Sequence, residues 1–237
     1  MIYTASTKLI IPEGKKTGCL YRTDRPGDNC GMLEEGEQEN SRIKLIDPDD
    51  WGPHIGTTPR RDSIGWIFDQ DGVGSCAAES ATGNLSLCEA KQGREVKKLS
   101  PWYVYHTTSG GRDAGSNIGS NLKFLRDNGV CEMSLWPRSK GWRATPSKEA
   151  DENAANHKLA EYFECTSTTA VGTALIKDFG VCFGWQGHAC FLIDLIDERT
   201  ARYVNSWHES WGDKGCGKIR LDAINFGYGC YAYRTVV

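Results

Sequence analysis

The chain has 237 residues, a formal net charge of −3, and 39% hydrophobic against 25% charged residues, a composition typical of a globular protein with its own core. The near-neutral charge, without clustered Lys and Arg between aromatics, argues against a nucleic-acid partner. No apolar run is long enough to cross a bilayer. The first 12 residues lack the continuous apolar core of a signal peptide. We therefore expect no membrane partner, and a cytoplasmic or virion-associated location rather than classical secretion.

Residues 1–50 are polar and rich in Gly, Lys and Glu. The stretch EEGEQENSR at 34–42 is typical of a solvated surface loop. We expect residues 1–50 to form an N-terminal arm that packs on the lobe of strands in the second half of the chain, or a small cap over a cleft. Residues 51–237 would then form one main domain, with a helical lobe at about 70–150 and a β lobe at about 151–237.

Helical patterns dominate the first half of the main domain. Ser75 can cap a helix over residues 76–92, which Gly93 would end. Pro101 follows a capping serine, as at the first position of a second helix. That second helix lies within residues 99–111, and further helices are expected within 117–129 and over 153–163 and 169–179.

Strand patterns dominate the last third of the chain, where short apolar or alternating runs are rich in aromatic and branched residues. Helices first and strands last predict an α+β fold, with a helical lobe packed against an antiparallel β-sheet or barrel lobe and a cleft between them. The expected strands cover residues 180–185, 188–196, 201–207, 217–221 and 230–236.

Ten cysteines are spread along the chain. No CxxC pair occurs and no Cys/His cluster has zinc-ligand spacing, so we expect no metal site. Cys182 and Cys190 lie in apolar runs and are expected to be buried. Cys19 and Cys30 flank a polar loop and are the best candidates for a disulfide, unless the compartment is reducing.

Cys76 lies where a glycine-rich turn becomes a helix, in FDQDGVGSCAAESATGNL at 68–85. A helix N-terminus lowers the pKa of a thiol and favours the nucleophilic thiolate. Gly74 lets the backbone turn closely, so that the amide of Cys76 can face a developing oxyanion, and Gln70 can add a side-chain amide. A nucleophile also needs a base, normally a histidine held by a third group. These residues alone do not distinguish a nucleophile from a buried cysteine that begins a helix.

The stretches VGSCA (73–77), GHACFLIDLI (187–196) and NSWHESWGDKGCGKIRL (205–221) resemble, in order, the cysteine, histidine and asparagine blocks of the papain-like cysteine proteases. The resemblance covers about residues 60–235 and implies a papain-like two-lobed fold and a cysteine endopeptidase that needs no cofactor. It implies that Cys76 is the nucleophile, His188 the general base and acid, and Asn205 the residue that orients His188. Gln70 falls where the family keeps its oxyanion-hole glutamine.

The same resemblance implies a substrate-binding cleft for a peptide or protein. Gly74 and Ser75 precede the nucleophile, and Gly115 and Ser116 fall where the family has the Gly-Gly pair that lines the cleft. An extended substrate would pair with that backbone as an added strand. Trp207 would shield the Asn–His hydrogen bond from water. We expect a monomer. In terms of this family, residues 1–50 correspond to an N-terminal arm or a short pro-like extension.

The chain departs from the family pattern at several positions. Val73 replaces a half-cystine, and Ala77 replaces the aromatic residue after the nucleophile. Glu79 stands where an apolar residue is usual, and its carboxylate could raise the pKa of the thiol. Only Gln186 and Gly187 separate two strands that the family joins by a long connection, so we expect the histidine side of the cleft to be more open.

Two other functions stay open. The same constellation could serve a transpeptidase or an amidase, with the open histidine side admitting an acceptor amine. Ala77 and Glu79 also leave room for an inactive binding protein on a papain-like scaffold. His208 replaces a glycine of the asparagine block and is a further candidate to touch the substrate or the triad.

Overall fold

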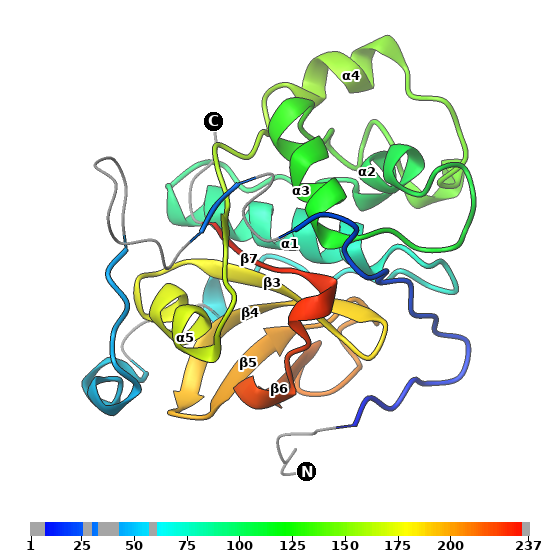
Figure 1. The fold of residues 1–237 in the computed structure, drawn as a ribbon. Helices are drawn as coiled ribbons and strands as arrows, with labels where there is room; N and C mark the ends of the chain where they lie inside the picture. The colour runs from blue at the N-terminus through cyan, green and yellow to red at the C-terminus, as the bar shows by residue number, and fades with distance from the viewer. Residues whose placement is uncertain (1–7, 26–29, 33–42, 57–60, 234–237) are drawn as a thin grey trace.

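A computed structural model of the chain describes residues 8–25, 30–32, 43–56 and 61–233. In Figure 1, the helices formed within residues 76–154 lie above the sheet, and the helix of residues 168–176 lies against the strands. This arrangement confirms the predicted α+β class. None of the described helices is both long and apolar enough to cross a bilayer. The helices are α1 (Cys76–Lys91), α2 (Pro101–Thr108), α3 (Ile118–Asp127), α4 (Lys148–Ala154) and α5 (Thr168–Ile176).

Helix α1 is the central element of the molecule. It packs on α2 and α3 and also on strands β3 (Gly180–Trp185) and β4 (His188–Asp197), so nearly all of its side chains are buried. Small residues permit this close approach, because a Cβ at Gly83 would lie 2.8 Å from the ring of Phe191. The helix that begins at Cys76 is therefore held rigidly between the two lobes.

The helix predicted over 153–163 is wrong. Helix α4 begins at Lys148, where the Ser147 hydroxyl accepts the N–H of Ala150 at 3.2 Å, and it ends at Ala154. The following backbone bonds to another segment, since Leu159 N–H donates to Leu125 O and His157 O accepts from Val130. Tertiary hydrogen bonds thus take the backbone groups that a longer helix would need.

Seven strands form one open sheet in the order β1-β2-β7-β3-β4-β5-β6. Among the described strands, β1 and β2 are parallel, and the other neighbouring pairs are antiparallel. The described strands do not close into a barrel. A two-residue turn, Gln186–Gly187, joins β3 to β4 and pairs Trp185 with His188. The remaining strands are β1 (Gly31–Met32), β2 (Phe163–Glu164), β5 (Thr200–Val204), β6 (Cys216–Arg220) and β7 (Cys230–Tyr233).

The sheet has two buried faces, each with its own core. One core joins the sheet to α1, α2 and α3, and the other lies between the sheet and α5. Trp51 closes the second core, because its ring lies directly on the backbone of α5 at Gly172.

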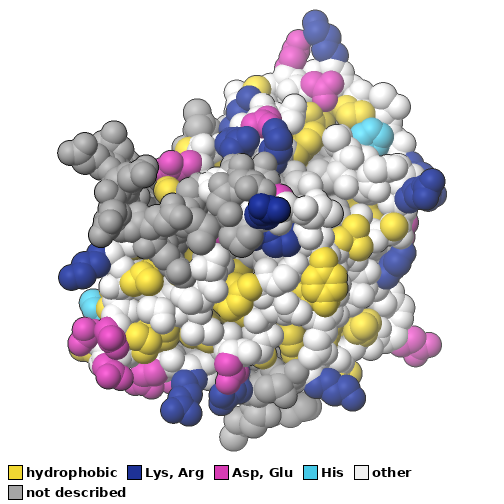
Figure 2. Space-filling model, viewed as in Figure 1, with side chains coloured by type: hydrophobic (Ala, Val, Ile, Leu, Met, Phe, Trp, Pro, Cys, Tyr) yellow, Lys and Arg dark blue, Asp and Glu magenta, His cyan; other side chains and the backbone are white. Residues whose placement is uncertain are grey.

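On the face shown in Figure 2, Lys and Arg side chains are scattered among acidic and uncharged ones.

The N-terminal segment of residues 8–25, called the arm here, crosses the junction between the lobes. In Figure 1 the dark blue trace runs up one side of the molecule and then passes between the helices and the strands. Its backbone binds both lobes: Cys19 N–H donates to Gly187 O at 2.8 Å, Ser116 N–H donates to Gly18 O at 2.9 Å, and Leu20 N–H donates to Ser116 O at 3.1 Å. The arm therefore forms an isolated parallel bridge, between Cys19 and Ser116, and its hydrogen bonds connect the two lobes.

The predicted disulfide between Cys19 and Cys30 is wrong, since both are free thiols. Cys19 is held in the cleft by its bridge to Ser116 and is only 5% exposed. Cys30 is half-buried and directly precedes β1, which pairs with β2. Each cysteine is thus fixed by a different part of the fold.

Candidate functional site

Cys76 is the first residue of α1 and is fully buried. The backbone of Ala189, of Gly18 and of Ala77 lies close to its thiol. These three residues belong to β4, the arm and α1. The thiol thus lies where the helical lobe, the sheet and the arm meet, next to the residue that follows His188.

His188 begins β4, and its Nε2 lies 2.7 Å from Oδ1 of Asn205. The same Oδ1 accepts the N–H of Ser206 at 2.8 Å, so it is an acceptor and Nε2 carries the proton. The buried Nδ1 of His188 has no hydrogen-bond partner among the described residues. Trp207 stacks on the imidazole with ring centroids 4.4 Å apart. This packing covers the His–Asn hydrogen bond and leaves Nδ1 able to accept a proton.

Burial controls the protonation of both groups. It raises the pKa of the Cys76 thiol to about 12, although backbone hydrogen bonds from Ala189, Gly18 and Ala77 oppose the shift. It lowers the pKa of His188 to about 4, against the hydrogen bond to Asn205. With the arm in place, thiol and imidazole are therefore both neutral at neutral pH.

Gln70 is fully buried and its side chain is fixed at both ends. Oε1 accepts the Ser206 hydroxyl at 2.7 Å. Nε2 donates to the carbonyl of Val73 at 2.7 Å and to the carbonyl of Lys16 at 3.0 Å. The side-chain amide that the sequence predicts as an oxyanion donor thus donates a hydrogen bond to a peptide carbonyl of the arm.

Three of the predicted substrate-binding residues touch the arm. A Cβ at Gly18 would lie 2.1 Å from Gly74 O, and one at Gly115 would lie 2.2 Å from Gly18 O. Only glycine permits this approach, and Gly115 also has φ +95°. Ser116 supplies the paired backbone. Ser75 is different, because its hydroxyl donates to Oε1 of Glu79 at 2.9 Å and makes no side-chain cap for α1.

The sequence did not predict that two carboxylates, those of Asp69 and Asp113, bind the arm. Asp69 binds the ammonium of Lys15 at 2.6 Å, and Asp113 binds that of Lys16 at 2.7 Å. The paired residues are 54 and 97 positions apart in the sequence. No local pattern could have predicted such pairs.

The expectation of an open histidine side is wrong. The turn between β3 and β4 is as short as the sequence indicates, but the arm covers it. Leu9 N–H donates to Oε1 of Gln186 at 3.0 Å, and Gly18 and Cys19 both donate to Gly187 O. The arm thus takes the place of the missing connection.

His208 does not join the site. Its side chain is exposed, and its Nδ1 lies 3.0 Å from the hydroxyl of Ser210. Its backbone has φ +72° and donates to Phe68 O. His208 therefore lies in an exposed turn, and its ring bonds to Ser210 and not to His188.

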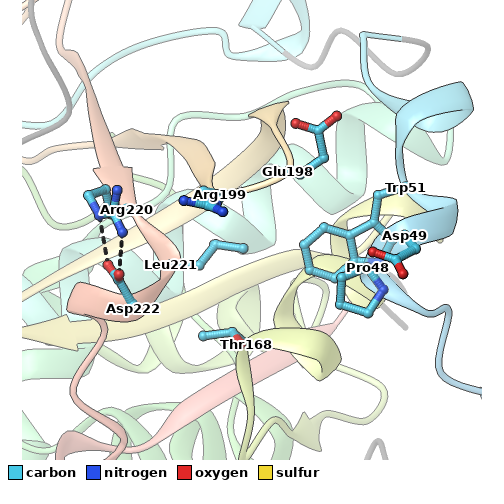
Figure 3. Close-up of a pocket in the computed structure, with 9 residues that line it drawn as sticks. All are labelled: Pro48, Asp49, Trp51, Thr168, Glu198, Arg199, Arg220, Leu221 and Asp222. Carbon is cyan, nitrogen blue, oxygen red and sulfur yellow. Dashed lines mark hydrogen bonds and ion pairs between the residues drawn. The ribbon is translucent and has the colours of Figure 1, made fainter.

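A separate depression of about 620 Å³ lies on the sheet lobe (Figure 3). None of the predicted catalytic residues lines it, and its Arg220 and Asp222 bind each other. Among the described residues, no group of three or more His, Cys, Asp or Glu is placed to hold a metal ion. The lining residues are Pro48, Asp49, Trp51, Thr168, Glu198, Arg199, Arg220, Leu221 and Asp222.

Comparisons with known proteins agree at the level of fold. No family model and no curated protein sequence matches the chain. Among solved structures, it is similar to xylellain, a cysteine protease from Xylella fastidiosa, at 18% identity and TM-score 0.63, over 92% of this chain and 100% of that one.

Two further solved structures are similar. Procathepsin L 3 of the Tenebrio molitor larval midgut matches at 15% identity and TM-score 0.62, over 88% of this chain and 74% of that one. A Carica candamarcensis cysteine protease in complex with E-64 matches at 13% identity and TM-score 0.58, over 73% and 94%. The chain therefore has the papain-like cysteine protease fold.

Proposed function

We propose that this protein is a cysteine peptidase, with Cys76 as nucleophile, His188 as base and acid, and Asn205 as the orienting residue. One observation carries the proposal. Cys76 begins α1 and is fully buried close to the backbone of Ala189, the residue after His188. The His188 ring has its Nε2 held by Asn205 and its Nδ1 without a partner among the described residues. Orienting one ring nitrogen and leaving the other as acceptor is what a general base requires.

The proposed reaction follows from these positions. Nδ1 of His188 takes the thiol proton, and the thiolate attacks a peptide carbonyl carbon. The backbone N–H of Cys76 and Nε2 of Gln70 hold the oxyanion. His188 then protonates the leaving amine, and water, deprotonated by the same imidazole, hydrolyses the thioester to release the acid and free thiol.

We also propose that the chain with its arm docked is latent. The arm carbonyl at Gln70 belongs to Lys16, whereas the arm residue whose backbone lies against the thiol is Gly18, with its N–H directed to Gly187 O at 3.1 Å. In a productive complex a single carbonyl group would present its carbon to the sulfur and its oxygen to Gln70. Since two different residues fill these places, the arm binds as an inhibitor and not as a substrate.

The transpeptidase or amidase alternative needs an acceptor amine on the histidine side, which the docked arm covers. In the arm-displaced chain, the ratio of ligation to hydrolysis with an added amine distinguishes it from a peptidase. The binding-protein alternative rested partly on Glu79. That carboxylate is paired with Arg138 at 2.7 Å, so it is compatible with a working thiol. Peptide hydrolysis remains the function that the geometry supports best.

Gly18→Ala in the full chain tests the proposal. The added methyl would lie 2.1 Å from a backbone oxygen of the cleft, which displaces the arm without touching either lobe's core. Hydrolysis of a fluorogenic peptide under reducing conditions should rise about tenfold or more over the unaltered chain, and irreversible labelling by a peptide epoxide should rise with it.

The control is Gly18→Ala combined with Cys76→Ala, which should abolish both signals. Hydrogen exchange of the arm amides establishes whether the arm has left the cleft. A folded Gly18→Ala variant with an exposed arm, but with no hydrolysis and no labelling of Cys76, would overturn the peptidase assignment and favour the binding protein.

A further inference from the structure

We propose that Asp69 and Asp113 determine specificity, selecting peptides with a Lys or Arg side chain on each side of the cleaved bond. This inference rests on the proposed peptidase function and names its substrate class. The arm supplies the observation, because its adjacent Lys15 and Lys16 place their ammonium groups on these two carboxylates while the carbonyl of Lys16 binds Gln70.

Asp113 is built into the cleft wall beside the nucleophile. Its Oδ1 accepts the N–H of Gly74 at 2.8 Å and the hydroxyl of Tyr105 at 2.9 Å, which leaves Oδ2 for Lys16 at 2.7 Å. Burial acts to raise the pKa of Asp113, but the hydrogen bonds from Lys16, Gly74 and Tyr105 lower it overall. Two of these three donors remain when the arm leaves, so the side chain stays ionised and fixed.

Asp69 lies on the histidine side of the site. It immediately precedes Gln70 and forms a backbone bridge with Trp207, which stacks on His188. Both of its oxygens contact the ammonium of Lys15, at 2.6 and 2.8 Å. The N–H of Asp71 donates to Oδ1 at 2.9 Å and fixes its orientation.

The two carboxylates thus flank the position where a substrate carbonyl would be attacked. Each side chain is only about a quarter exposed, and among the described residues no Lys or Arg outside the arm pairs with either. When the arm leaves, two partly buried negative charges lose their partners, and a substrate cation restores the pairing. Asp113, near Gly115, would bind the side chain on the acyl side, and Asp69, near Trp207, the one on the leaving side.

Paired fluorogenic peptides test this inference in the arm-displaced Gly18→Ala chain. One peptide carries Lys on both sides of the cleaved bond, and the other carries norleucine, which keeps the length of the side chain but not its charge. We expect kcat/KM for the lysine peptide to exceed that for the norleucine peptide by about tenfold or more. Adding Asp113→Asn or Asp69→Asn should each reduce this ratio severalfold.

Asp71→Asn is the matched control, since Asp71 is an exposed carboxylate on the same loop with φ +53°, a conformation that Asn tolerates. Its ratio should equal that of Gly18→Ala alone. A ratio near one, or a ratio that neither Asp69→Asn nor Asp113→Asn changes, would mean that these carboxylates only hold the arm, and would overturn the inference.

A second readout separates this inference from the peptidase function. The affinity of both peptides is measured by fluorescence polarisation on the Gly18→Ala chain that also carries Cys76→Ala, which needs no catalysis. Charge-selective binding that is lost with Asp113→Asn supports the inference even if no peptide is hydrolysed. Hydrolysis without charge selectivity in either readout supports the peptidase and rejects the inference.

Discussion

Glu79 is a buried charge one turn after the nucleophile, at a position where an apolar side chain would be expected. The guanidinium of Arg138 binds both of its oxygens, at 2.7 and 2.8 Å, and also lies over the ring of Trp102 at 4.4 Å. Burial raises the pKa of Glu79, whereas Arg138 and the Ser75 hydroxyl lower it. The carboxylate therefore depends on Arg138 to remain ionised inside the protein.

Arg138→Ala should destabilise the protein by about 3 kcal/mol at pH 8, because it leaves the buried carboxylate unpaired. The loss should be smaller near pH 5. Without Arg138 the folded-state pKa of Glu79 rises further above its unfolded value, so stability is retained at low pH and is lost as pH rises through the folded pKa. Urea unfolding at both pH values measures the effect.

Lys123→Ala is the control for this prediction. It removes an exposed ion pair with Asp127 four residues along α3, which contributes about 0.5 kcal/mol or less. An Arg138→Ala variant no less stable than Lys123→Ala, or one with the same loss at both pH values, would show that Glu79 does not need its partner.

Among the helices and strands, those that depend on local sequence patterns were predicted from those patterns. The helix beginning at Cys76 and the strands after residue 180 follow from hydrophobic spacing, turn glycines and β-branched residues. The helix expected over 153–163 failed because its backbone bonds to residues 125–130 instead. The catalytic candidates were found because a motif fixes their order along the chain.

The sequence predicts an N-terminal arm, but the contacts of the arm could not be predicted in the same way. Its contacts join residues far apart in the sequence, such as Lys16 with Asp113 and Gly18 with Gly187. Its residues have no hydrophobic period that would indicate a strand. Pairing with Ser116 and the turn at Gly187 requires the cleft to exist first, so the information lies in the tertiary structure and not in the segment.

Helix α5 supplies a prediction at this scale. A Cβ at Gly172 would lie 2.1 Å from the ring of Trp51, although alanine favours a helix over glycine by about 1 kcal/mol. Overpacking should prevail, because the ring is fully buried, so Gly172→Ala should lose about 1–3 kcal/mol. Thermal unfolding measures it.

The comparison is Gly52→Ala, beside Trp51, where a Cβ would meet nothing within 4 Å. Its stability should stay within about 0.5 kcal/mol of the unaltered chain. Equal stability of the two variants would mean that Trp51 can leave α5 at no cost, and that segment 43–56 is not fastened there.

The molecule as a whole is closed by a segment that belongs to neither lobe. Lys15 binds Asp69 beside the sheet lobe, Lys16 binds Asp113 on the helical side, and Gly18 lies on the thiol. The same closure removes water from Cys76 and His188 and separates their pKa values to about 12 and 4. Docking of the arm and protonation of the site are therefore linked equilibria.

This linkage predicts that the closed protein is acid-sensitive. His188 has a folded pKa of about 4 against an ordinary value of 6.5, so between these values the unfolded chain binds a proton that the closed state excludes. Stability is complete above about pH 6.5 and falls by about 3 kcal/mol as the pH approaches 4. Asp113, whose pKa is lowered, contributes a separate loss at still lower pH, as it becomes protonated.

Urea unfolding between pH 4 and 7 measures the dependence. His188→Gln is the reference, because its amide can still donate to Asn205 but does not titrate, so its stability should change little over the same range. Subtracting the two curves isolates the proton taken up by His188 from all other groups. Parallel curves would mean that the imidazole is hydrated in the closed state, and that the arm does not exclude water from the site as its contacts with Gly74, Gly115 and Gly187 require.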